Sequence, residues 1–434
     1  MALINFPNLP AWAQTLASIL PLSALIKFVD VETSIHVYEL RGGSVPFWNW
    51  PIPPGGARIL LSKDTAAGDC LLDQPQRSQG LTCIDGRYGN QYPCSAPATT
   101  RLWAGKEEEA GEEIINTSKN MENRDRREQV LYVIQLREDT TPDAEHVERK
   151  KSFWRNFANS VRRRGPRYLA VSCTGWICWI GLIVVSFMGH LYIAVIYLAL
   201  MPSTCFVVSL THGTKPRKPL VRGAQPFPRL VIAAGSKNPH YWYAFEGHQT
   251  LLNGLLNISL APSQKLPYRP FGLYLLRLLT LGQWAMALGS SATMGWDAFV
   301  ISVWTTFCIV ASAYLYPVEI GTKEWLTRDC KVKATTIKAV LSSRYALLFA
   351  LAMINPDTDR DETKWMDPII AESPEREKIW KNMLDWANGV GLQDEAALKA
   401  EWWWRLMEEG VMVGKQVRKS LKDYSDPRNV GSLV

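Results

Sequence analysis

The sequence predicts a multi-pass α-helical membrane protein with two transmembrane hairpins, a small α+β N-terminal domain and a helical C-terminal domain. Two observations support this fold class. First, 47% of the 434 residues are hydrophobic, yet the mean hydropathy is only −0.08, because apolar residues are gathered in blocks with charged residues between them. Second, no charged residue occurs from Tyr168 to Leu210. An uncharged run of this length is typical of membrane spans.

The first hairpin is predicted at residues 168–210. One span needs about 20 apolar residues, so this run holds two spans. We expect the turn between them at Met188-Gly189-His190. A basic collar at residues 148–167 precedes the hairpin and ends with cations predicted to bind anionic lipid: Arg162, Arg163, Arg164 and Arg167.

The second hairpin is predicted at residues 270–318, with spans at Phe271–Ser290 and Ala298–Tyr316. Arg277 lies in the first of these spans. A charge inside a span is costly and usually has a partner, although a long side chain near the membrane edge can also extend to the interface. Arg277 is therefore a candidate interface residue.

The formal net charge of +7 is concentrated in the stretch that also holds the apolar runs. Basic residues flank both hairpins, at 148–167, 211–269 and 319–355. Because lysine and arginine favour the cytoplasmic side, we expect both hairpins to enter from that side and both chain ends to be cytoplasmic. The sequence does not indicate which membrane holds the protein.

Residues 1–147 are predicted to form the α+β domain with a charged loop. Strands are expected at Ser34–Leu40, Ala57–Leu61 and Gln129–Leu136, where apolar and polar residues alternate or apolar residues cluster. The proline-rich residues 46–56 are predicted to be a turn-rich loop between the first two strands. Ala11–Phe28 is predicted to be an interfacial or buried helix, with a span as the alternative.

The chain after the second hairpin is predicted to be a basic linker with an interfacial or fifth spanning helix (319–355), followed by a soluble helical domain (356–434). Ser373-Pro374-Glu375 has the residues of a helix start. A second helix is expected from about Asp394. Trp402, Trp403 and Trp404 cannot all face one core, because successive helical residues turn by about 100°.

No motif predicts an enzyme, a cofactor or a metal site. The eight cysteines include no C-x-x-C pair, and neither H-E-x-x-H nor a phosphate-binding loop occurs. The three N-terminal cysteines, an odd number, suggest free thiols in a reducing compartment. Because the basic charge accompanies the apolar spans, nucleic-acid binding is not expected.

The loop at 211–269 contains the only polar residues that suggest a site. His240, Glu246 and His248 are candidate catalytic groups, set among cations. The alternative is an amphipathic segment whose Tyr241, Trp242 and Tyr243 lie at the membrane interface. The second interpretation is favoured.

The segments Ala24–Asp30 and Pro226–Leu260, with two hairpins between acidic terminal regions, give the chain a family resemblance. It resembles uncharacterised multi-pass membrane proteins of filamentous fungi. The resemblance implies a eukaryotic membrane and no particular activity.

Together these features favour a non-enzymatic membrane anchor or scaffold with cytoplasmic domains. A membrane-embedded enzyme or accessory protein for a lipophilic substrate is the first alternative, and a small transporter or channel subunit is the second. Expected partners are anionic lipids, and proteins bound through the terminal domains. Homo-oligomerisation is left open, as is glycosylation at Asn116 and Asn257.

Overall fold

The structure is a computed structural model that describes residues 6–23, 31–42, 46–51, 70–74, 80–104, 114–116, 128–138, 166–212, 216–220, 227–235, 240–261, 269–357, 363–390 and 395–423. The chain forms two compact units. Unit 1 contains residues 1–74, 141–217 and 262–325, and unit 2 contains residues 75–140, 218–261 and 326–434. Each unit is therefore built from three separate stretches. This division differs from the linear domain order predicted above, because residues 1–147 are shared between both units.

Unit 1 contains four helices that are long and apolar enough to cross a membrane. These are α6 (Pro166–Met188), α7 (Tyr192–Thr211), α9 (Arg269–Thr293) and α10 (Trp296–Val310), which continues as the π-helical η4 (Ala311–Leu315). The pairing into two hairpins, with the first turn at His190 (φ 59°), agrees with the sequence analysis. These elements are consistent with an integral membrane protein.

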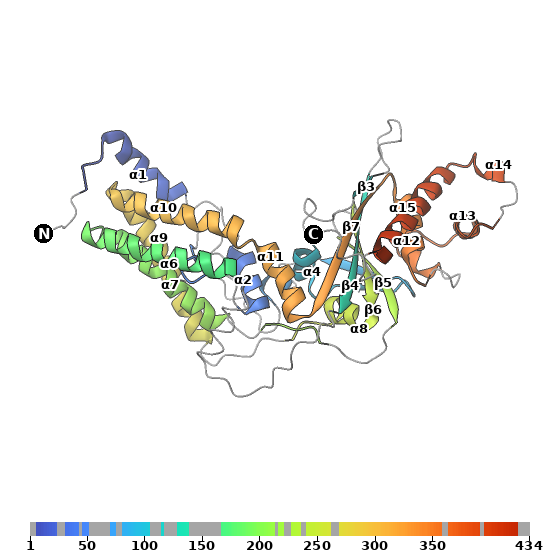
Figure 1. The fold of residues 1–434 in the computed structure, drawn as a ribbon, viewed down its shortest axis with the longest axis horizontal. Helices are drawn as coiled ribbons and strands as arrows, with labels where there is room; N and C mark the ends of the chain where they lie inside the picture. Colours follow the sequence, from blue (N-terminus) through green and yellow to red (C-terminus); the bar gives the residue numbers. More distant parts are fainter. Residues whose placement is uncertain are drawn as a thin grey trace. The chain divides into compact units, whose positions relative to one another are not determined.

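The turns of the two hairpins lie at the same end of the helix group (Figure 1). The backbone N–H of Ala194, in the first turn of α7, donates a hydrogen bond of 2.9 Å to Oδ1 of Asp297, in the first turn of α10. The Asp297 carboxylate thus satisfies an amide that α7 cannot satisfy itself, and its charge suits the positive helix terminus.

Shorter helices of unit 1 pack around this group. Helix α1 (Ala11–Ser23) lies against α9 and α10, with Ala13 and Ala17 buried and Trp12 exposed. Its 13 residues are fewer than the roughly 20 that a span needs. Helix α2 (Val31–Arg41) packs against α11 (Val318–Glu324), and the 3-10 turn η1 (Leu71–Asp73) lies beside α2. The π-helical η5 (Trp325–Asp329) follows α11.

The strand predicted at Ser34–Leu40 is wrong, because these residues belong to α2. Every side chain from Ile35 to Leu40 is buried, including His36 and Glu39. The polar residues that suggested a solvent-facing side of a strand instead meet buried polar partners. The second predicted strand, at Ala57–Leu61, lies outside the described residues.

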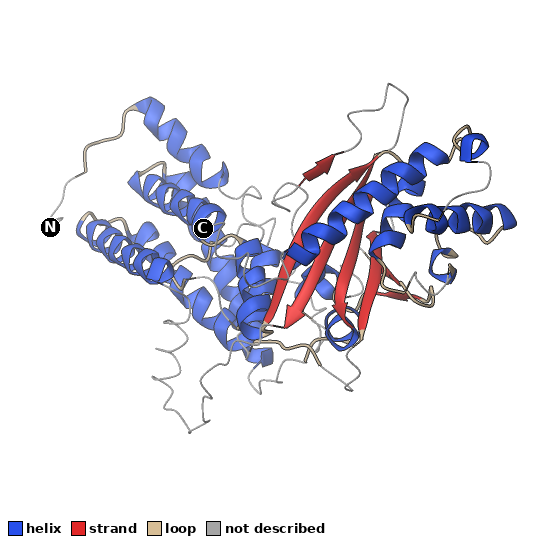
Figure 2. Cartoon of the chain, turned by 45° about the vertical axis from the view of Figure 1, so that its right-hand side comes forward, coloured by secondary structure: helices blue, strands red, loops and turns tan. Residues whose placement is uncertain are grey.

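Unit 2 is organised around a seven-stranded mixed sheet in the order β2-β1-β5-β6-β4-β7-β3 (Figure 2). Strand β4 pairs in parallel with β6, β3 pairs in parallel with β7, and the other neighbours are antiparallel. The strand predicted at Gln129–Leu136 is confirmed as β4. The strands are β1 (Leu81–Asp85), β2 (Gln91–Pro93), β3 (Ile114–Asn116), β4 (Gln129–Glu138), β5 (Pro228–Gly235), β6 (Tyr241–His248) and β7 (Val332–Leu341).

The prediction of an amphipathic loop at 211–269 is wrong where β5 and β6 lie, because both are inner strands of this sheet. Leu230 and Ile232 of β5 and Trp242 and Phe245 of β6 are buried by neighbouring elements, and Tyr241 and Tyr243 are half-buried. Short aromatic stretches have the same composition whether they meet a membrane interface or a protein core, so composition alone could not distinguish the two.

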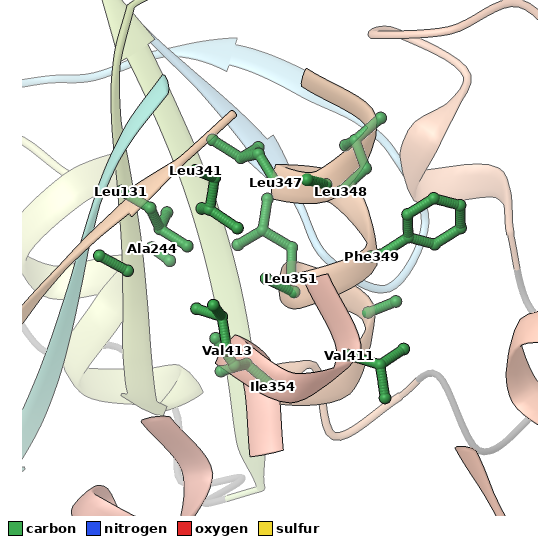
Figure 3. Packing of buried hydrophobic residues seen from close by; sticks show 14 of the residues in the cluster. Leu131, Ala244, Leu341, Leu347, Leu348, Phe349, Leu351, Ile354, Val411 and Val413 are labelled. Carbon is green, nitrogen blue, oxygen red and sulfur yellow. The ribbon is translucent and has the colours of Figure 1, made fainter. Parts of the chain in front are cut away.

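Helix α12 (Arg344–Ile354) and helix α15 (Trp404–Asp423) cover one face of the sheet. Leu347 and Leu351 point toward the strands, whereas Phe349 lies on the opposite side of α12 (Figure 3). The prediction of an interfacial or fifth spanning helix here is wrong. Its apolar residues are buried within unit 2. The possible span was Thr336–Asn355, and its first six residues instead belong to β7, which begins in the predicted linker.

On the other face of the sheet, Trp103 of α4 (Pro97–Ala104) packs on Phe245 with ring centroids 5.4 Å apart. Helix α8 (Gln249–Leu252) and the π-helical η3 (Asn253–Asn257) follow β6 directly. The core of unit 2 therefore includes side chains from both faces of the sheet, and no membrane is needed to cover them.

The C-terminal helices form part of unit 2. The predicted start at Ser373 is confirmed, since its side chain accepts a hydrogen bond from the Arg376 backbone N–H at the beginning of α13 (Pro374–Ala387). The second predicted helix is divided into α14 (Glu395–Leu398) and α15. Trp403 and Trp404 are buried and Trp402 is 56% exposed, so the three do not share one environment. Trp402 and Trp403 lie in the turn before α15, however, so helical rotation is not the reason for the difference. The short η7 (Lys364–Met366) precedes α13.

Helices α12 and α15 approach closely because α15 has glycines at its crossing point. A Cβ at Gly410 would lie 2.5 Å from Cβ of Phe349, and one at Gly414 would lie 2.6 Å from Cβ of Met353. Real Cβ atoms do not approach so closely, so the two glycines set the distance between the helices.

We predict that Gly410→Ala destabilises unit 2 by about 1–3 kcal/mol through overpacking. Alanine improves helix propensity by about 0.5–1 kcal/mol, which is too little to compensate. Hydrogen–deuterium exchange of α12 and α15 peptides in the purified full chain should show faster exchange in the variant. Gly80→Ala is the control, because nothing lies within 4 Å of a Cβ at Gly80. Equal exchange in both variants would show that the crossing has room.

Candidate functional site

The polar residues suggested by the sequence do not converge. His240 precedes β6, Glu246 lies within it and His248 ends it. Because a strand rises about 3.3 Å per residue, His240 and Glu246 are about 20 Å apart. His240 Nδ1 lies 3.3 Å from the backbone oxygen of Glu128, to which it can donate, and His248 is exposed. No shared catalytic centre follows from these three residues.

Glu246 has a structural partner. Its Oε2 accepts a hydrogen bond of 3.4 Å from Gln135 Nε2 on the adjacent strand β4. Burial raises the pKa of this carboxyl above its ordinary value, and the Gln135 hydrogen bond opposes part of that effect. The side chain thus joins two strands.

The predicted interface aromatics also lie in the sheet. Trp242 is buried in the core of unit 2, and its indole N–H donates to Oε1 of Gln129 at 2.9 Å. Tyr243 stacks on Tyr132 with ring centroids 5.5 Å apart, and Tyr241 lies in the same strand. Burial of Trp242 corrects its assignment to a membrane interface.

The predicted lipid-binding cations are only partly placed. Arg277 is half-buried on α9. Arg167 lies in the first turn of α6, and its side chain is outside the described part of the chain, as are Arg162, Arg163 and Arg164. Their role in lipid binding remains a prediction.

The structure shows a different polar cluster, centred on α2 in unit 1. His36 and Glu39 are three residues apart and so lie on one face of the helix. That face meets two other segments. One is the start of η1, with Cys70, Leu71 and Leu72, and the other is the end of α7, where His212 is the C-cap residue.

Short polar contacts connect these three segments. Oε1 of Glu39 lies 2.6 Å from His212 Nδ1, and Oε2 of Glu39 accepts the Leu71 backbone N–H at 2.9 Å. His36 Nδ1 accepts the next amide, that of Leu72, at 3.1 Å. The α2 side chains therefore cap the first amides of η1, which a short turn cannot satisfy internally.

Arg217 attaches a further segment to the same helix. Its backbone N–H donates to the Leu40 carbonyl at 2.9 Å, and its own carbonyl accepts the Trp325 indole N–H at 2.8 Å. Arg41 also pairs with Glu324 of α11. Helix α2 thus fixes several chain segments at the end of the helix group opposite the hairpin turns.

The electrostatics favour an anionic Glu39 and a neutral His36. Burial lowers the pKa of His36, and the nearby carboxylates of Asp73 and Glu39 oppose this effect only in part. For Glu39, burial raises the pKa, but the hydrogen bond to His212 and the electrostatic effects of His212, His36 and Arg217 together outweigh it, and the net pKa is lowered. One carboxylate and one neutral imidazole are therefore held within a few ångströms in a buried site.

Histidine, cysteine and aspartate, which can all bind a metal ion, occur together in this cluster. The potential ligand atoms of His36, Cys70 and Asp73 all lie within 4.8 Å of one another. A metal-bound imidazole normally donates its second ring N–H to an acceptor. In His36, Nδ1 instead accepts the Leu72 amide, so the single proton of the neutral ring is on Nε2. Nε2 faces Oδ2 of Asp73 at 3.8 Å.

A metal at Nε2 would therefore displace that proton and break the Leu72 hydrogen bond, or require an imidazolate. The described geometry fits a proton-bearing structural network better than a metal centre. Sequence reasoning missed the cluster, because Cys70 and His212 are far from His36 along the chain. The helical i,i+3 spacing of His36 and Glu39 was the only local signal, and the strand prediction concealed it.

The comparisons with known proteins add no assignment. No family model, no curated protein and no solved structure matches this chain. The site is therefore interpreted from its own geometry.

The lowered pKa of His36 predicts a pH-dependent stability. The folded state binds the His36 proton less tightly than the unfolded chain, whose ordinary pKa is 6.5. The contribution of His36 to the free energy of unfolding should therefore be fully present above pH 6.5. It should decrease as the pH falls toward 5. The contribution of Glu39 is lost only below its ordinary value of 4.5.

His36→Asn tests this assignment, because Asn Oδ1 can accept the Leu72 amide without titrating. The difference in thermal unfolding midpoint between pH 7 and pH 5, measured in detergent micelles, should be smaller in His36→Asn than in the natural chain. His248→Asn, at an exposed position, is the control. An unchanged pH difference in His36→Asn would assign the effect elsewhere.

Proposed function

We propose that this chain is an integral membrane protein that anchors a folded α/β domain at one face of a membrane. In this proposal α6, α7, α9 and α10 span the bilayer as two hairpins, and unit 2 is the anchored domain. The chain acts as a non-enzymatic scaffold whose partners are anionic lipids, through the basic collar, and proteins that bind unit 2. The length and composition of the four helices support the spans.

The observation that carries the proposal is the interleaving of the sheet with the hairpins. Strand β4 precedes the first hairpin, β5 and β6 lie between the hairpins, and β7 follows the second. Yet β4 is hydrogen-bonded to both β6 and β7. One sheet lies on one side of a membrane, so each hairpin must return the chain to the side from which it entered.

The charge distribution supports the cytoplasmic side. The segments beside the spans on the unit 2 side are the basic ones, and lysine and arginine favour the cytoplasmic face. An even number of spans also places both ends of the chain on that side, as the sequence analysis expected.

The polar groups within the spans favour an anchor over a transporter. Within the apolar ranges Leu169–Met188, Tyr192–Thr211, Pro270–Thr293 and Trp296–Leu315, the charged residues are Arg277 and Asp297, and Asp297 caps α7. Several uncharged polar side chains bond to one another: Tyr197 OH lies 3.2 Å from Thr305 Oγ1, and Gln283 donates to Thr204 Oγ1 at 2.9 Å. Ion pathways normally contain intramembrane charges, which this helix group largely lacks.

We predict that Tyr88→Cys and Met294→Cys are labelled from opposite faces of the membrane. Tyr88 is exposed in unit 2, and Met294 is exposed at the turn of the second hairpin. The background carries alanine at the exposed Cys173 and Cys178 and at the half-exposed Cys330. In sealed vesicles of known orientation, an impermeant maleimide should reach one position from each face. Alkaline carbonate should not release the protein.

Two results would contradict the proposed function. Labelling of both cysteines from the same face would show that the second hairpin does not cross. Release of the protein by carbonate would show that the apolar helices do not hold it in the bilayer. Detergent-permeabilised vesicles, in which both positions should react, provide the control.

A further inference from the structure

The segment Pro46–Pro51 lies inside the helix group of unit 1. The sequence analysis predicted it to be part of a turn-rich loop in the N-terminal α+β domain. In the structure Trp48 is 0% exposed, Asn49 is 2% exposed and Trp50 is 3% exposed. The segment contains no helix or strand, so its burial must be explained by contacts with the surrounding helices.

Trp48 fills a space that α6 and α10 leave for it. Its ring centroids lie 5.8 Å from Trp304 and 5.4 Å from Phe307, both on α10. Its indole N–H donates to the Ser172 carbonyl of α6 at 3.2 Å. A Cβ at Gly175 of α6 would overlap the Trp48 ring, so the absence of a side chain at this position makes room for the indole.

Polar side chains from the long helices bond to the segment. Gln283 of α9 donates to the Trp50 carbonyl at 3.3 Å, and the Cys308 thiol of α10 contacts the Trp48 carbonyl at 3.8 Å. Asn49 Nδ2 donates to Ser312 Oγ at 3.0 Å. Non-helical backbone is tolerated at membrane depth only where the protein buries it and satisfies its polar groups. In this segment the backbone carbonyls of Trp48 and Trp50 are buried and each accepts a hydrogen bond from a helix side chain.

The contacts lie well inside the helices. Gly175 is nine residues from the start of α6 and thirteen from its end, which corresponds to about 14 Å and about 20 Å of helix. Gln283 lies near the middle of α9 in the same way. The segment therefore reaches the interior of the helix group.

The chain before and after the segment lies at one end of the helix group. Before it, Glu39 of α2 contacts His212, at the end of α7. After it, the Leu71 amide donates to the same Glu39. The described elements nearest to the segment in the sequence on both sides, α2 and η1, belong to this part of unit 1, at the end opposite the hairpin turns.

We propose that Pro46–Pro51 is a re-entrant membrane segment that enters from the basic face and closes the space between the four spans. This inference rests on the proposed function, because the helices must span for the segment to lie at membrane depth. It deepens that function in one respect: Trp48 and its neighbours occupy the interior of the helix group, so the group is a sealed anchor and provides no passage for a solute.

A disulfide crosslink in native membranes tests the placement. Asn49→Cys and Ser312→Cys are combined in a chain whose native cysteines are alanine, except Cys308, which is serine so that a donor to Trp48 remains. A protease site inserted within residues 105–113 lies between the two cysteines in the sequence, so cleavage leaves them on separate fragments. Copper phenanthroline oxidation should join the two fragments on a non-reducing gel, and reductant should separate them. Asn49→Cys with Ser203→Cys, exposed on α7, is the mismatched control.

Two glycine variants on α6 test the space for the indole. Gly175→Val should expel Trp48 and lower the crosslink yield to that of the mismatched control. Gly181→Val should leave the yield unchanged, since nothing lies within 4 Å of a Cβ there. A crosslink that persists in Gly175→Val, or is absent from the original pair, would overturn the proposal.

The outcomes separate this inference from the proposed function. Carbonate-resistant protein with opposite-face labelling but no crosslink would leave the anchor intact and remove the re-entrant segment. A crosslink in protein that carbonate releases would show a buried segment in a helix group that does not span. That result would overturn the proposed function, because the helices would not span. It would also overturn the re-entrant segment, because the buried segment would not lie at membrane depth.

Discussion

The structure depends above all on the need to satisfy backbone polar groups where water is excluded. An unpaired buried N–H or C=O costs about as much as a lost hydrogen bond, and more in hydrocarbon. The four long helices meet this need internally. The segment Pro46–Pro51 cannot, because it forms no helix, and side chains of the surrounding helices bond to its carbonyls instead. This explains why Gln283, which is 1% exposed, occurs at a buried position of the mainly apolar helix α9. The polar side chain of Gln283 in a candidate span thus completes the backbone hydrogen bonding of another segment.

The same requirement accounts for the cluster around α2. Moving a carboxylate out of water costs several kcal/mol, which is recovered only when partners surround the charge. Glu39 has His212 on one oxygen and the Leu71 amide on the other. Removing one partner from such a buried pair typically costs about 3–5 kcal/mol, because the remaining charge is left uncompensated. The cluster therefore holds α2, η1 and α7 together. Its histidines and carboxylates are explained by these contacts between segments, without a bound ligand.

The sequence correctly predicted the elements whose residue pattern occurs in only one kind of environment. A long uncharged run and a basic flank identified the hairpins, and a cluster of apolar residues between two glutamines identified β4. It failed where two environments select the same residues. The aromatics of β6 suit a core or an interface, and α12 is as apolar as a membrane helix. The residues of α2 alternate in polarity as a strand does, although His36 and Glu39 are buried. Proline and tryptophan predicted the loop at 46–56, but its insertion depends on Gly175, Gln283 and Cys308, which no local pattern connects to it. The α2 cluster likewise combines residues separated by whole elements.

Interleaving links membrane insertion to the folding of unit 2. In the proposed topology β4 is made first, and its neighbours β6 and β7 follow only after one and two hairpins have been completed. Until then β4 has open hydrogen-bonding edges, and such edges favour aggregation. An inverted hairpin would leave β6 or β7 on the wrong side and the sheet incomplete. In the proposed topology the spans hold the chain in the bilayer, so the basic flanks are not needed for attachment. In that topology they would orient each hairpin, because the sheet forms only when both hairpins are oriented alike.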